Sequence, residues 1–200
     1  MRFLALGDSY TIGECVAEVE RWPIQLKHKL GRHGVPIDDP IIIARTGWTT
    51  DELLAGIHQA NPQGVYELVS LLIGVNNQYR GCDPNQYKAG FRTLLNMAIN
   101  FSDENPTRVI VLSIPDWGAT PFADGKDRVQ IGIEIDAFNS SNQEITLELG
   151  ARYINITPIS RAARDDRSLF ASDGLHPSGK MYELWTRSIL PDALEVLNRR

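Results

Sequence analysis

Cysteine and histidine are scarce in this sequence and are scattered along it. The two cysteines, Cys15 and Cys82, are too few for a disulfide framework or a four-cysteine zinc site. We expect both to be reduced thiols, and a single bridge in an oxidising compartment is the alternative. The four histidines are scattered, with no cysteine and histidine paired at metal-ligand spacing, so we expect no metal site.

Long apolar runs and an excess of positive charge are also missing. The apolar start of the chain, residues 3–6, ends at Gly7-Asp8, well short of a signal peptide or of the roughly 20 apolar residues of a membrane span. The 20 basic residues are outnumbered by 25 acidic ones, for a net charge of −5. We therefore expect a cytoplasmic chain without a membrane span and without a nucleic-acid partner.

Five short apolar runs alternate with segments of helical periodicity. The runs cover residues 3–6, 41–44, 68–73, 109–114 and 153–156. Continuous apolar runs of this length are typical of strands that are buried on both faces of a parallel sheet. The alternation predicts one α/β domain over residues 1–200, a three-layer α/β/α sandwich around a five-stranded parallel sheet.

Between the apolar runs and after the last of them, five helices are expected. They cover residues 23–30, a segment that begins at Thr49, a segment that begins at Asp83, residues 131–149 and residues 178–197. Thr49 and Glu52 form a capping-box pattern, which is typical of a helix start. Pro191 is expected to kink or split the last helix.

Two motifs at opposite ends of the chain contain residue types that suit nucleophilic catalysis. Gly7-Asp8-Ser9 follows the first apolar run, and open α/β sheets bind ligands at the carboxyl ends of their strands. Asp173 precedes His176 by three residues. A serine hydroxyl needs a base such as histidine, and a carboxylate must fix the tautomer of that histidine. Each motif alone is equally typical of turns and helix caps.

Two further loops are expected at the same edge of the sheet. Gly47 follows the second apolar run and Asn76 follows the third. A backbone N–H and a side-chain amide can both donate hydrogen bonds to a developing oxyanion. Glycine and asparagine are also common turn residues, so neither position alone indicates catalysis.

Taken together and in order, these motifs resemble the four sequence blocks of the SGNH, or GDSL-type, serine hydrolase superfamily. The blocks are Gly7-Asp8-Ser9-Tyr10, Gly47, Gly74-Val75-Asn76-Asn77 and Asp173-Gly174-Leu175-His176-Pro177. The resemblance implies a flavodoxin-like strand order, 2-1-3-4-5. It also implies that Ser9 is the nucleophile, His176 the base and Asp173 its orienting carboxylate. The implied oxyanion hole consists of the Ser9 and Gly47 N–H groups and the Asn76 amide.

The sequence departs from the family pattern at two positions. Tyr10 replaces the usual leucine after the nucleophile, and Asn77 replaces the usual aspartate after the oxyanion asparagine. Neither side chain is a catalytic group in the implied mechanism. The change at Asn77 concerns the hydrogen bonding of its loop.

The resemblance implies an esterase or lipase that hydrolyses small-molecule esters or thioesters of small to medium acyl groups through an acyl-enzyme, without a cofactor. Thioesterase, lysophospholipase, carbohydrate deacetylase and acyltransferase activities share this step and remain alternatives. A flavodoxin-like binding module without catalysis is an alternative of a different class. A nucleotide-binding domain is disfavoured, because no glycine-rich phosphate-binding motif follows the first apolar run.

Aromatic side chains are expected in the loops at the catalytic edge. These are Tyr10, Trp48, Tyr79, Trp117 and Phe122. They could line a substrate pocket, since binding clefts favour aromatic walls, or they could pack over the sheet. The sequence favours neither interpretation.

Overall fold

The five predicted strands form one parallel sheet in the computed structural model, which describes residues 1–198. They are β1 (Phe3–Gly7), β2 (Ile41–Ala44), β3 (Leu68–Leu72), β4 (Val109–Leu112) and β5 (Arg152–Ile154). Their spatial order is β2-β1-β3-β4-β5, and every neighbouring pair is parallel. This is the order that the resemblance implies. Residues 199 and 200, at the end of the predicted domain, lie outside the described residues.

The burial of each strand follows its place in the sheet. β1 and β3 lie inside the sheet and are buried along their whole length. Leu4 of β1 pairs with Ile41 on one side and with Val69 on the other. The edge strands β2 and β5 are only partly buried, because each has a neighbouring strand on one side only.

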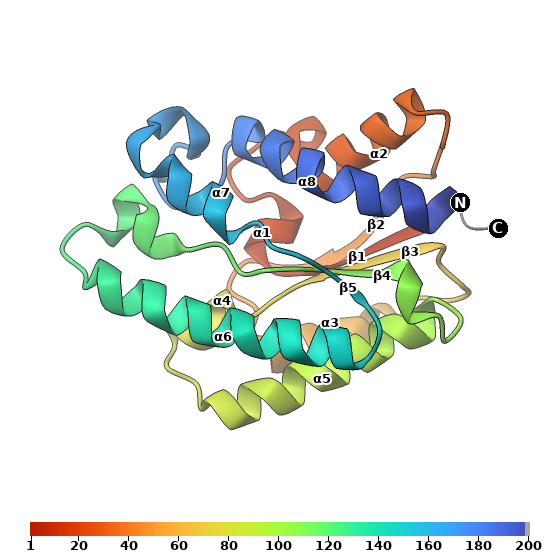
Figure 1. The fold of residues 1–200 in the computed structure, drawn as a ribbon, viewed down its shortest axis with the longest axis horizontal. Helices are drawn as coiled ribbons and strands as arrows, with labels where there is room; N and C mark the ends of the chain where they lie inside the picture. Colours follow the sequence, from red (N-terminus) through yellow and green to blue (C-terminus); the bar gives the residue numbers. More distant parts are fainter. Residues whose placement is uncertain (199–200) are drawn as a thin grey trace.

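Helices cover both faces of the sheet, as the sandwich prediction requires (Figure 1). On one face, α2 (Trp22–Arg32) packs against α8 (Gly179–Asn198). On the other lie α3 (Thr50–Ala60), α5 (Pro84–Phe101) and α6 (Arg128–Glu148). Among residues 1–198, no helix has both the length and the apolarity needed to cross a bilayer.

Two helix predictions need correction. The helix predicted over residues 23–30 is longer: α2 continues through Gly31 and ends at Arg32. The glycine with a left-handed φ after this helix is Gly34, at 77°. α8 is continuous through Pro191, so of the predicted kink or split, the split does not occur. A proline removes one helical hydrogen bond. The helical turn after Pro191 is stabilised by the burial of Ala193, Val196 and Leu197 in the core.

Three short helices follow strand ends and were not predicted. They are α1 (Ser9–Ile12), α4 (Val75–Tyr79) and α7 (Thr157–Ala162). Segments of four to six residues are too short to show helical periodicity in a sequence. Two of them, α1 and α4, contain residues of the candidate site.

Candidate active site

Ser9 lies at the carboxyl end of β1, as the first residue of α1. The chain turns at Gly7, where any side chain would overlap the Thr11 hydroxyl and the Leu72 carbonyl. The backbone N–H of a first helical residue has no acceptor inside its own helix. Among residues 1–198, the Ser9 N–H has no backbone acceptor, so the turn places both the Ser9 hydroxyl and a free backbone donor at the sheet edge.

Asp8 is the N-cap of α1 and is completely buried. Its Oδ1 accepts a hydrogen bond from the Tyr10 N–H at 3.0 Å, whereas Oδ2 has no hydrogen-bond partner among the described residues. Burial raises the pKa of Asp8 to about 7, against the lowering effect of the Tyr10 N–H. A carboxyl group that is partly protonated near neutral pH therefore lies directly beside Ser9.

His176 and Asp173 belong to the base loop, which we define as residues 171–177, ahead of α8. The His176 Nδ1 lies 2.5 Å from the Asp173 Oδ2. The other oxygen, Oδ1, accepts the backbone N–H groups of Leu175 and His176, each at 3.0 Å. Burial raises the pKa of Asp173, but the hydrogen bonds from His176 and the two N–H groups lower it further, to about 2. The ionised carboxylate favours a proton on Nδ1, which leaves Nε2 as the acceptor.

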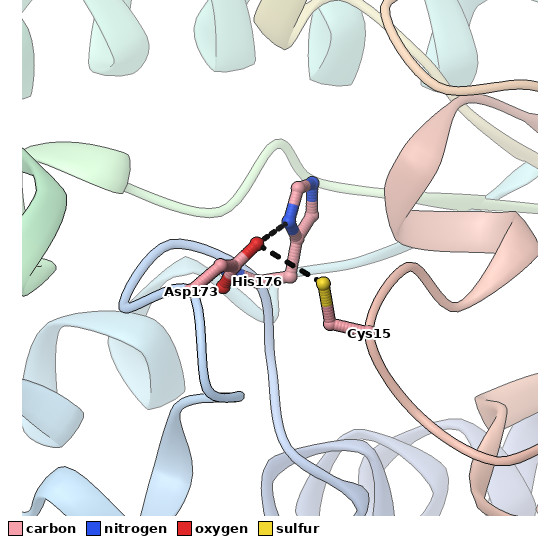
Figure 2. A group of neighbouring side chains, drawn as sticks. All are labelled: Cys15, Asp173 and His176. Atoms are coloured by element: carbon pink, nitrogen blue, oxygen red, sulfur yellow. Dashed lines mark hydrogen bonds and ion pairs between the residues drawn. The ribbon is translucent and has the colours of Figure 1, made fainter.

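A third side chain contacts this pair. The Cys15 Sγ lies 3.4 Å from the Asp173 Oδ2, the same oxygen that His176 contacts (Figure 2). Cys15 follows α1 and has a positive φ of 61°. Partial desolvation raises the pKa of its thiol, as do the hydrogen bond to Asp173 and the charges of Asp173 and Glu14. Sequence reasoning missed this contact, because Cys15 is 158 residues away and no spacing pattern links them.

Ser9, Gly47, Asn76 and His176 line one pocket, although they come from four separate segments. The pocket has a volume of about 180 Å³. Within residues 1–198, no hydrogen bond joins the Ser9 hydroxyl to His176. Such contacts are often long before substrate binds, so the arrangement remains compatible with proton transfer.

The oxyanion loops, defined here as residues 45–48 and 74–76, lie beside Ser9 in this pocket. Gly47 has φ 85°, a left-handed conformation that favours glycine, in a turn closed by the Trp48 N–H and the Arg45 carbonyl at 3.3 Å. In the described chain, the Gly47 N–H makes no backbone hydrogen bond. The Asn76 Nδ2 donates to the Trp48 carbonyl at 2.9 Å. An amide nitrogen has two hydrogens, so Asn76 retains one for a ligand.

Two neighbouring side chains hold the oxyanion loops. The Arg80 Nη2 donates to the Gly47 carbonyl at 2.6 Å. Asn77 is buried, and it accepts from the Thr50 N–H at 3.1 Å and donates to the Thr50 Oγ1 at 3.0 Å. The asparagine that departs from the family pattern therefore ties α4 to the first turn of α3.

Four of the five aromatic residues singled out in the sequence line the pocket: Tyr10, Tyr79, Trp117 and Phe122. Trp48 does not. Its ring lies against Gly56 of α3, where any side chain on Gly56 would overlap the ring. For Trp48, packing is therefore the correct interpretation. Three lining residues were not predicted, namely Thr46, Val75 and Leu175, and each is a direct sequence neighbour of a predicted site residue.

Comparison with known protein families gives a match over most of this chain. The model of the GDSL-like lipase/acylhydrolase family matches residues 5–184. No curated protein is similar enough in sequence to count as a match.

Solved structures show the same fold. The crystal structure of TesA has a TM-score of 0.74 and 18% identity, covering 98% of this chain and 99% of that one. The lipase/acylhydrolase from Enterococcus faecalis has a TM-score of 0.69 and 23% identity, with 100% and 97% covered. Axe2, an acetylxylan esterase from Geobacillus stearothermophilus, has a TM-score of 0.71 and 17% identity, with 100% and 94% covered.

Proposed function

Since this chain belongs to the GDSL-like lipase/acylhydrolase family and is a carboxylic ester hydrolase, we propose that it acts through an acyl-enzyme formed on Ser9. In this proposal His176 is the general base and Asp173 orients it. The observation that supports it best is the shared pocket, which Ser9, His176 and both oxyanion candidates line. The base is already paired with an ionised carboxylate.

The mechanism follows from these positions. The His176 Nε2 takes the Ser9 proton as the hydroxyl oxygen attacks the acyl carbonyl, and it then protonates the leaving group. A water molecule, deprotonated by the same nitrogen, releases the acid from Ser9. The N–H groups of Ser9 and Gly47 and the Asn76 amide bind the oxyanion in both steps.

The substrate is an ester or thioester with a small to medium acyl group. The pocket volume of about 180 Å³ lies below the roughly 300–1,000 Å³ of sites for drug-sized ligands. Aromatic rings form part of its wall, and the Trp117 ring lies 5.3 Å from that of Tyr79 and 6.1 Å from that of Phe122. Tyr79 and Phe122 are about half exposed, which suits a leaving group that extends from the pocket towards solvent.

The test is the hydrolysis of p-nitrophenyl esters from acetate to decanoate by the wild type and by Ser9→Ala. We expect Ser9→Ala to abolish turnover with an unchanged circular dichroism spectrum. Ser188→Ala, on α8, is the matched control and should retain full activity. Turnover by Ser9→Ala at the wild-type rate would exclude Ser9 as the nucleophile.

Two further measurements separate the alternatives. Acyl-coenzyme A thioesters of the same chain lengths, assayed by thiol release, distinguish a thioesterase from an esterase. A fluorophosphonate probe should label Ser9 and not Cys15. If no ester or thioester is hydrolysed and Ser9 is not labelled, the binding-module alternative replaces the proposal.

A further inference from the structure

We propose that Cys15, Asp173 and His176 form an inhibitory binding site for Zn²⁺. The inference rests on the proposed function, because two of the three residues are the proposed catalytic pair. The Cys15 Sγ, one Asp173 oxygen and one His176 ring nitrogen all lie within 4.8 Å of one another (Figure 2). Thiolate, carboxylate and imidazole are the ligand types that Zn²⁺ binds in proteins.

One distance between donor atoms already matches a tetrahedral zinc site, and a second would match after a small shift of the Asp173 carboxylate. Zinc–ligand distances of about 2.0–2.3 Å place neighbouring ligand atoms about 3.4 Å apart. The Cys15 Sγ and the Asp173 Oδ2 are 3.4 Å apart, which already fits. The His176 Nδ1 and the Asp173 Oδ2 are 2.5 Å apart, so the carboxylate must withdraw by about 1 Å to admit the ion.

The site is accessible, and its charge suits a cation. Cys15 is exposed, and the Asp173 side chain retains 30% of its surface, so an ion can approach from solvent. Asp173 and Glu14 both act on the Cys15 thiol as negative charges, and the same charges attract a divalent cation. Water would complete a fourth ligand position.

Binding would stop catalysis by changing the proton positions on His176. Zn²⁺ would form bonds to the Cys15 Sγ and the His176 Nδ1. The thiol proton passes to solvent, and the Nδ1 proton is replaced by one on Nε2, so one proton is released in total and no atom is oxidised or reduced. With Nε2 protonated, His176 cannot accept the Ser9 proton.

Zinc inhibition of p-nitrophenyl acetate hydrolysis is the first test, with each variant normalised to its own rate without metal. We expect the half-inhibitory ZnCl₂ concentration of Cys15→Ala to be at least about tenfold above that of the wild type, since even outer-shell changes cost about 10–100-fold in metal affinity. Cys82→Ala is the matched control and should match the wild type. Excess EDTA should restore the wild-type rate. Equal inhibition of the wild type and Cys15→Ala would overturn the site.

A binding measurement without turnover distinguishes failure of this site from failure of the proposed function. Co²⁺ added to the wild type should produce a thiolate-to-cobalt charge-transfer absorption, which Cys15→Ala lacks and Cys82→Ala retains. Isothermal titration with ZnCl₂ should show the same difference. A wild type without the absorption excludes the site, whether or not the chain hydrolyses esters.

Discussion

The base loop and the oxyanion loops border the same pocket, but they hold their functional groups by different means. In the base loop, the ionised carboxylate of Asp173 accepts hydrogen bonds from the His176 ring, two backbone N–H groups and the Cys15 thiol. In the oxyanion loops, the Asn76 amide donates to the Trp48 carbonyl, and Arg80, from outside the loops, donates to the Gly47 carbonyl. The base side therefore orients its functional group with a negative charge, whereas the groups proposed to meet the oxyanion are neutral N–H donors.

An isosteric change of charge on the base side should have the largest effect. Asp173→Asn keeps the shape of the side chain but removes the charge and can place an N–H against the His176 Nδ1. We expect kcat to fall by about 10⁴, because the wrong tautomer is then favoured. The measurement is kcat on the best p-nitrophenyl ester, with thermal unfolding as a check of the fold.

Asp165→Asn is the matched control for that change, since Asp165 is an exposed aspartate from the same part of the chain. It should keep the wild-type kcat. If Asp173→Asn also kept it, the orientation of His176 would not depend on the carboxylate, and the contrast between the two sides of the pocket would fail.

Asp8 and Asp173 should make the free energy of unfolding depend on pH in opposite directions. The pKa of Asp8 rises from 3.8 to about 7 in the folded state, so the folded chain binds more protons than the unfolded chain between these values. Stability from Asp8 is therefore present at pH 4 and is lost as the pH rises to about 7, by about 4 kcal/mol in all. The pKa of Asp173 is lowered to about 2, so its contribution is instead lost as the pH falls from about 4 to 2.

Denaturant unfolding of the wild type and Asp8→Asn between pH 4 and 8 tests this expectation. The free energy of unfolding of the wild type should fall over that range relative to the variant, which cannot ionise at this position. If the free energies of unfolding of the wild type and Asp8→Asn changed in parallel with pH, Asp8 would have an ordinary pKa. Between pH 2 and 5, the free energy of unfolding of the wild type should instead rise with pH relative to that of Asp173→Asn.

The sequence predicted the parts of this molecule that depend on local pattern. Apolar runs predicted the five strands, and the resemblance implied their order, 2-1-3-4-5, which the sheet confirms. Contacts between distant segments left no such pattern. Cys15 and Asp173 are far apart in the sequence and come into contact only in the folded chain. Trp48 and Trp117 are the same residue type in similar loops, and only the structure shows that Trp117 lines the pocket and Trp48 does not. The catalytic roles of Ser9 and His176 remain predictions.

On the oxyanion side, loss of a single donor should have a smaller effect than loss of the base-side charge. Asn76→Ala removes the amide and leaves the Trp48 carbonyl without its partner. We expect kcat to fall by about 10²–10³ with little change in KM, because the interaction strengthens only as the oxyanion forms. Asn85→Ala, on the exposed first turn of α5, is the control. An unchanged kcat in Asn76→Ala would assign the oxyanion contacts to the backbone N–H groups alone.

The smallest expected effect concerns Arg80, which contacts the Gly47 carbonyl at 2.6 Å and Glu52 at 3.2 Å. Arg80→Ala removes the hydrogen bond to the Gly47 carbonyl, which loosens the turn on the side next to the peptide that carries the Gly47 N–H. The arginine is about half exposed, so its net contribution is about 1 kcal/mol and kcat should fall about fivefold. Arg80→Lys should restore part of the loss, since its amine can still donate to the carbonyl. A rise in KM without a fall in kcat would instead mean that Arg80 binds substrate, and the oxyanion side would then also depend on charge.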